Sequence, residues 1–205
     1  MPQQPSDLAS TESSTVRAPT WPALVAGAPG VILAFAWGVA EGTLFFFVPD
    51  VLISLAAALD PRRAWKHVIA AALGAVLAGA IMFGWAVRDP VVARDAVARV
   101  PFVSARMLAN AESRYQSHGI GALFIAAVAG VPYKIYAVVA PAHVSEPTFL
   151  LATFPARAYR FVAVWAIAGL FGAWLRNSLR LTPSQILAIH IGMWTVFYAI
   201  YWSVI

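Results

Sequence analysis

Long apolar runs separated by short polar turns make up most of the chain. The first run covers residues 21–59. It is too long for one membrane span of ~20 residues and slightly short for two spans with a turn. Glu41 and Asp50 interrupt it, and Pro49 precedes the second acid. Because proline removes a backbone donor and clashes with the preceding turn, the pattern predicts a span followed by a re-entrant, broken-helix piece at about 38–59.

A second run of the same kind lies at about residues 119–142. Pro132 interrupts it, and Lys134 follows two residues later. The order of apolar half, proline, charged residue and apolar half echoes the first run, so we interpret the two as a weak internal repeat. Transporters place paired broken helices of this kind at a binding site near the bilayer midplane.

Three further stretches are predicted to cross the membrane without a break. They cover residues 68–87, 146–174 and 185–205. The polar stretch at 88–117 separates the first of these spans from the second apolar run, and Pro101 divides it into two short segments with apolar residues at helical spacing. These segments are expected to form amphipathic helices on the membrane surface, with a solvated connector as the alternative.

Small residues recur every four positions in two places. One series is Ala70, Gly74 and Ala78, and the other is the pair Gly38 and Gly42 around the first acid. Such spacing lets two helix backbones approach closely, so we expect close packing at both places.

The composition indicates an integral membrane protein. Of the 205 residues 61% are hydrophobic and 11% charged, more apolar surface than a soluble domain could cover. We expect an all-α polytopic membrane protein with one transmembrane domain over residues 21–205, after a disordered tail at 1–20 rich in Ser, Thr, Pro and Gln. Three tryptophans in the middle of apolar segments are interpreted as packing residues: Trp37, Trp165 and Trp194.

Charge and cysteine content exclude several classes of function. The absence of cysteine rules out disulfides, thiol nucleophiles and cysteine-based metal sites. The net charge of +5 is spread over short loops, which is typical of contact with anionic head groups and not with nucleic acid. We expect membrane lipids as partners, no cofactor and no metal, and the sequence leaves a homo-oligomer open.

Five ionisable residues lie within apolar runs. Unpaired, they would cost on the order of 10–15 kcal/mol in total on insertion scales, so we expect them to compensate one another. Three of the five are cations, and the excess positive charge suits an anionic ligand, because arginine offers a bidentate fork and lysine a movable point charge. Burial favours the protonated form of a carboxyl group, which suits proton exchange. The five are Glu41, Asp50, Lys134, Arg157 and Arg160.

Each of these residues also has a structural interpretation. Glu41 with Arg157 or Arg160 could form a buried ion pair that only holds helices together. Asp50 could cap a helix N-terminus, and Lys134 could snorkel to the membrane surface. His190, alone on an apolar helix, is interpreted as a packing residue and not as a proton carrier.

The order of the motifs resembles the DedA family of bacterial membrane proteins, the SNARE-associated or VTT-domain superfamily, over about residues 35–174. The sequence is closer to a divergent branch that reads Pro-Tyr-Lys and carries its arginines in the next helix, and Ala129 stands where the usual pattern has an arginine. The motifs are Glu41 with Pro49-Asp50, His118-Gly119, Val131-Pro132-Tyr133-Lys134, and Arg157 with Arg160.

The resemblance implies two facing re-entrant hairpins between spanning helices, broken at Pro49 and Pro132. It also implies proton-dependent movement of lipids such as undecaprenyl phosphate or phosphatidylethanolamine-type lipids between leaflets. We therefore predict a transporter or scramblase for an anionic lipid head group in the bacterial inner membrane. The predicted proton-coupling residues are Glu41 and Asp50, and the predicted substrate-binding residues are Lys134, Arg157, Arg160 and Tyr133.

Other functions are consistent with the same residues. A proton-coupled carrier of a small soluble ion or drug could use the same charges, and a non-catalytic membrane organiser could need them for structure alone. We do not expect an enzyme, because no nucleophile and base stand together and the four histidines are scattered.

Overall fold

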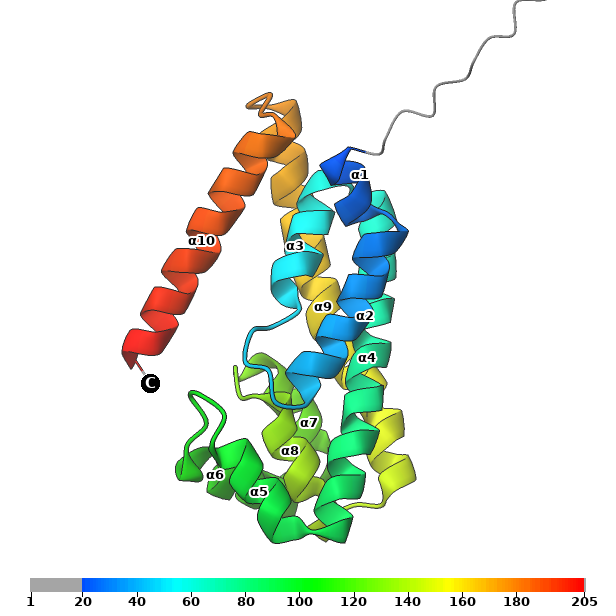
Figure 1. The fold of residues 1–205 in the computed structure, drawn as a ribbon, viewed down its shortest axis with the longest axis vertical. Coiled ribbons are helices and arrows are strands. Elements are labelled where there is room, and N and C mark those ends of the chain that lie inside the picture. The colour runs from blue at the N-terminus through cyan, green and yellow to red at the C-terminus, as the bar shows by residue number, and fades with distance from the viewer. Residues whose placement is uncertain (1–19, 205) are drawn as a thin grey trace, which may run out of the picture.

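The computed structural model describes residues 20–204, in which helices are joined by short turns and loops (Figure 1). No strand occurs in this range. The predicted disordered tail at 1–20 lies outside the described residues, except for Thr20, which precedes the first helix.

The first apolar run folds as two helices that lie antiparallel and are joined by a turn. A short helix α1 (Trp21–Ala26) leads into α2 (Ala28–Gly42), and α3 (Asp50–Leu59) returns toward the end from which α2 came (Figure 1). The connection at residues 43–49 lies about halfway along the molecule. The predicted break before Asp50 is confirmed, since Pro49 is the residue before α3.

The second apolar run folds in the same way from the opposite end of the molecule. A single 3-10 turn η1 (Gly119–Gly121) opens it, α7 (Ala122–Val128) runs inward, and α8 (Tyr133–Val139) runs back to the 3-10 turn η2 (Ala140–Ala142). Gly130 has a φ of +69°, a conformation that glycine adopts without strain. The break predicted at Pro132 is confirmed, because α8 begins directly after it.

Within residues 20–204, three helices are long and apolar enough to cross a membrane. They are α4 (Pro61–Arg88), α9 (Glu146–Asn177) and α10 (Pro183–Val204), the last meeting the criterion over Pro183–Tyr201. The most apolar window of α4 is 56% buried and that of α10 only 11%. Helix α4 is therefore the centre of the bundle, and α10 stands at its edge, where it contacts α3 (Figure 1).

Close packing of α2 on α4 depends on glycine. A Cβ atom added at Gly38 would collide with the backbone oxygen of Ala71, and one at Gly74 with the backbone oxygen of Phe35. The close approach expected from the small-residue spacing is thus confirmed at both positions.

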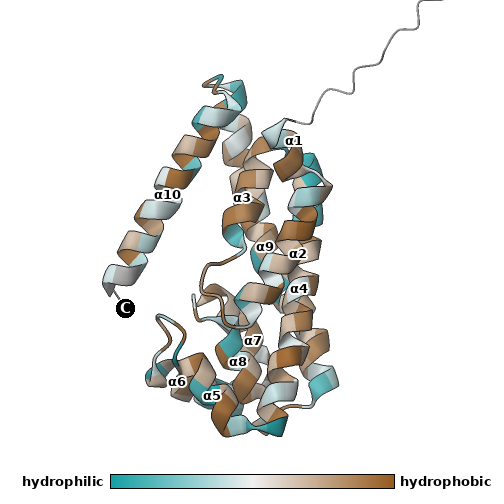
Figure 2. Ribbon diagram, in the orientation of Figure 1, coloured by the Kyte–Doolittle hydropathy of each residue, from teal (hydrophilic) through white to brown (hydrophobic). Residues whose placement is uncertain are grey.

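The polar connector forms two amphipathic helices, as predicted. Helix α5 (Pro90–Ala98) and α6 (Ala105–His118) are separated by a turn that contains Pro101. Figure 2 shows polar residues concentrated on these helices and at the ends of the long helices. Tyr115 of α6 is buried against α8, and burial raises the pKa of its phenol.

Candidate functional site

The two helix breaks lie against each other and line one small cavity. Residues 43–49 contribute Phe46 and Val48, and the second break contributes Gly130, Val131 and Pro132. The cavity volume is about 90 Å³, enough for several water molecules. Its charged lining consists of Glu41, Lys134 and Arg160, and α10 covers it with Trp194, Phe197, Tyr198 and Tyr201.

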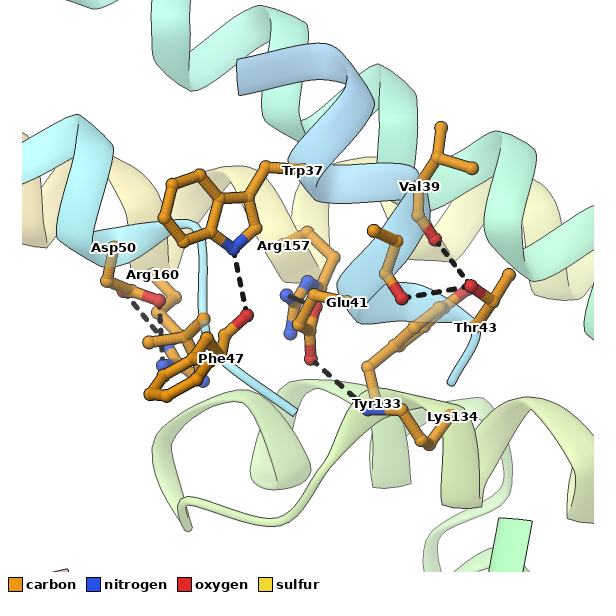
Figure 3. Close-up of polar contacts among 12 residues, drawn as sticks. Trp37, Val39, Glu41, Thr43, Phe47, Asp50, Tyr133, Lys134, Arg157 and Arg160 are labelled. Atoms are coloured by element: carbon orange, nitrogen blue, oxygen red, sulfur yellow. Dashed lines mark hydrogen bonds and ion pairs between the residues drawn. The ribbon is translucent and has the colours of Figure 1, made fainter. Parts of the chain in front are cut away.

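Glu41 lies in the last turn of α2 and is 3% exposed. Its Oε2 accepts a hydrogen bond of 2.5 Å from Arg157 Nη2 of α9, and its Oε1 lies 4.0 Å from Lys134 Nζ of α8 (Figure 3). One carboxylate is therefore shared between two cations that come from different helices.

Asp50 is the first residue of α3 and is 2% exposed. Arg160 binds it at two points, Nε to Oδ1 at 3.3 Å and Nη2 to Oδ2 at 2.9 Å. A carboxylate is also favoured at this place because of the partial positive charge of a helix N-terminus. The interpretation of Asp50 as the N-cap is wrong, since Pro49 occupies that position.

Lys134 is the second residue of α8 and only 1% exposed. The snorkelling interpretation is therefore wrong. Within the described part of the chain its ammonium group makes no hydrogen bond, and its one ion pair is the 4.0 Å approach to Glu41. The charge of Lys134 is thus only weakly compensated by the protein where it lines the cavity.

Arg157 lies behind Glu41 and is not among the residues that line the cavity. Its guanidinium carbon is 5.3 Å from the ring centre of Tyr133 and 4.9 Å from that of Phe161, distances at which a cation is attracted to an aromatic face. Its Nε is buried and has no hydrogen-bond partner among the described residues.

Tyr133 also lies outside the lining of this cavity. Its hydroxyl group is 2.9 Å from Thr153 Oγ1. The hydroxyl of Thr153 in turn donates to the backbone oxygen of Phe149, and both residues belong to α9. Together with the ring contact to Arg157, this arrangement holds α8 against α9. The geometry favours a positioning role for Tyr133 over the direct substrate contact that we predicted.

The charges of the five ionisable residues do not cancel. Two carboxylates meet three cations, so the fully ionised cluster has an excess of one positive charge. All five predicted residues lie at one place where α2, α3, α8 and α9 meet (Figure 3). The expectation that they pair with one another is confirmed for Glu41 with Arg157 and for Asp50 with Arg160, whereas Lys134 only approaches Glu41 at 4.0 Å.

Several polar contacts around the site were not expected from the sequence. Trp37 Nε1 donates to the backbone oxygen of Phe47 at 2.9 Å, and the amide of Val48 donates to Tyr198 Oη at 3.1 Å. Trp194 Nε1 lies 3.2 Å from Ser54 Oγ. A tryptophan in an apolar segment carries one donor that requires a partner, and this is the signal that could have pointed to Trp37 and Trp194.

Comparison with known protein families, characterised proteins and solved structures finds no match to this chain. The resemblance to the DedA family therefore stays a prediction from the order of the motifs.

Proposed function

We propose that the protein is a transporter or scramblase that moves an anionic lipid head group between the leaflets of the bacterial inner membrane, with proton dependence. In this proposal α2 with α3, and α7 with α8, are re-entrant hairpins. The helix lengths support this. Helix α2 has 15 residues and α3 has 10, which give about 22 and 15 Å. Helices α7 and α8 have 7 residues each, which gives about 10 Å. Each is shorter than a bilayer core of ~30 Å.

The observation that carries the proposal is the position of Lys134. Its ammonium group is buried, lines a small cavity and has a single distant ion-pair partner in the described residues. A buried charge without a close partner of opposite charge is unfavourable unless a bound ligand supplies that charge. An anionic group in the cavity would meet Lys134 and Arg160 together, and a phosphate oxygen accepts hydrogen bonds from both types of side chain.

In this proposal, proton dependence arises at Glu41. This carboxylate faces Lys134 on α8 and Arg157 on α9, and it also acts electrostatically on Arg160. Protonation of Glu41 would add one positive charge to the cluster and so raise its affinity for an anion. Proton and anion would then bind cooperatively, because a ligand shifts an equilibrium by its differential affinity for the two states.

The test exploits the fact that the chain has two lysines, Lys134 and the exposed Lys66. Lys134→Met removes the excess charge and leaves the Glu41–Arg157 pair intact, so the protein should still fold. We expect at least a tenfold loss of phosphatidylglycerol movement in sealed proteoliposomes. Lys134→Arg should retain part of the rate, and Lys66→Met should stay within twofold of wild type.

Two results would contradict the proposal. One is lipid movement by Lys134→Met at the wild-type rate. The other is uptake of inorganic phosphate into the same vesicles without any lipid movement by the wild type, which would favour a carrier of soluble ions.

A further inference from the structure

Two apolar grooves flank α10 along its length. The first, of about 560 Å³, lies between α10 and the tip of the first helix pair, with Trp37, Phe45 and Phe47 opposite Ile191, Thr195 and Ala199. The second, of about 380 Å³, lies between α10 and α9, with Val164, Ile167 and Phe171 opposite Ile189 and Met193. Both volumes are in the range of ligand sites.

A line of polar contacts between α10 and α3 separates the grooves. His190 Nε2 lies 3.0 Å from the backbone oxygen of Val51, and Trp194 Nε1 lies 3.2 Å from Ser54 Oγ. At ~100° per residue, the α10 residues of the first groove fall on one flank of this line and those of the second groove on the other. A chain-like ligand would therefore occupy one groove or the other and not cross between them.

The grooves and the charged cavity meet at one residue. Trp194 lines all three, and Tyr198 lines both the charged cavity and the first groove. A compartment that carries Lys134 and Arg160 thus opens beside two apolar compartments. This combination matches one amphiphile with an anionic head and two apolar chains.

We infer that the substrate is a diacyl anionic phospholipid, held with its phosphate in the charged cavity and one acyl chain in each groove beside α10. The inference rests on the proposed function and narrows its substrate class. It prefers two-chain glycerophospholipids to single-chain lipid phosphates, because a single chain would leave one groove without its apolar partner.

The test is equilibrium binding of two lipids to the purified full-length chain in detergent: dioleoyl phosphatidylglycerol and its single-chain lyso form, which share a head group. Three α10 substitutions to tryptophan form a matched set. Ala199→Trp narrows the first groove, Ile189→Trp narrows the second, and Val196→Trp lies on an exposed flank in neither groove. Thr195→Trp replaces Ala199→Trp if that variant does not fold.

We expect the wild type to bind the diacyl lipid at least tenfold more tightly than the lyso lipid. Each groove variant should lose at least fivefold in affinity for the diacyl lipid and less than twofold for the lyso lipid, because one groove stays open. Val196→Trp should bind both lipids as the wild type does.

Three results would overturn the inference. They are equal wild-type affinity for the two lipids, undecaprenyl phosphate bound more tightly than the diacyl lipid, and unchanged diacyl affinity in both groove variants. A change of oligomeric mass in the groove variants with unchanged lipid affinity would assign the grooves to a second copy of the chain. Lys134→Met separates the two proposals. If this variant binds both lipids as the wild type does, the proposed head-group site is wrong. If it binds neither lipid while the groove variants bind both lipids as the wild type does, only the acyl-chain sites in the grooves are wrong.

Discussion

Glu41 is the residue at which anion binding and protonation converge in this proposal. Its two oxygens face different cations, Arg157 at 2.5 Å and Lys134 at 4.0 Å. The side chain is 3% exposed, so water offers little screening of either interaction. A change in the charge of Glu41 therefore changes its attraction to both α8, which carries Lys134, and α9, which carries Arg157.

Glu41→Gln should remove the pH dependence of lipid movement. Glutamine keeps the shape of the side chain and an acceptor for Arg157 but does not titrate. Because it leaves Arg157 and Lys134 without their carboxylate, some loss of stability is expected, and circular dichroism checks first that the variant is folded. We expect a rate that is constant within twofold between pH 5.5 and 8, measured by phosphatidylglycerol movement in proteoliposomes.

Glu112 provides the control for this variant. It pairs with Arg94 between α5 and α6, and its side chain is 37% exposed. Glu112→Gln should keep the wild-type pH profile. If Glu41→Gln also keeps it, the carboxylate has no part in proton coupling.

Arg157→Ala should destabilise the fold strongly. It would leave Glu41 buried beside the distant Lys134, and breaking a buried pair costs about 3–5 kcal/mol in free energy of unfolding. The double variant Glu41→Gln with Arg157→Met should recover part of this loss, because no unpaired carboxylate remains, although Lys134 loses its partner. Unfolding in detergent, followed by circular dichroism, measures both, and equal loss in the single and double variants would contradict the argument.

The membership of the charged cluster could be predicted from the sequence, but its pairing could not. Ionisable residues in apolar runs must find partners, which was enough to collect all five residues. The choice of Arg157 for Glu41 and Arg160 for Asp50 depends on how α9 is rotated against the break after Gly42. That rotation is set by contacts between residues 110 and 116 positions apart in the chain, which no local pattern contains.

Helix α2 packs so closely on α4 that one added methyl group at their contact should push the two helices apart. Gly38→Ala would place a Cβ atom against the backbone of Ala71, and overpacking of this kind costs about 1–3 kcal/mol. Gly84, on α4, has nothing within 4 Å of its would-be Cβ, so Gly84→Ala should stabilise by about 0.5–1 kcal/mol.

The two glycine substitutions are thus predicted to change the free energy of unfolding in opposite directions. Melting temperatures of the purified variants in one detergent provide the measurement. A Gly38→Ala variant as stable as the wild type would show that α2 and α4 can move apart without loss, and the close approach would then have no energetic role.

At the level of helices, local signals predicted most of what the structure shows. The prolines at 49, 101 and 132 lie in the connections that join α2 to α3, α5 to α6 and α7 to α8. Each proline lacks the backbone donor that a continuous helix would need. The isolated position of α10 was not predictable in this way. Hydropathy reports how apolar a helix is and not which partner covers it: α10 is less apolar than α4 but still apolar enough to cross a membrane, and its low burial does not follow from that.

If the protein moves lipids as proposed, α10 must move as well. Two helix pairs run in from opposite ends of the molecule (Figure 1), and the charged cavity at their tips is also lined by residues of α10. A lipid head group that reaches Lys134 from the bilayer would have to pass the aromatic residues of α10. Linking α10 to α3 should therefore stop lipid movement.

The absence of cysteine makes this experiment direct. Val51→Cys with His190→Cys places the chain's only thiols where α3 and α10 are in contact. Joining them with a reducible bifunctional reagent should lower lipid movement at least tenfold, and reduction should restore it. Each single-cysteine variant, treated in the same way, controls for modification alone, and transport that continues in the linked protein would show that α10 is static.

The long sequence separation of the ion pairs also has a consequence for biosynthesis. Arg157 is made 116 residues after Glu41, and Arg160 is made 110 residues after Asp50. At about 5–20 residues per second, both acids are made roughly 6–23 s before their arginines. During that interval the two carboxyl groups must stay protonated or hydrated, and a chain interrupted before α9 contains Lys134 but neither of the arginines that pair with them.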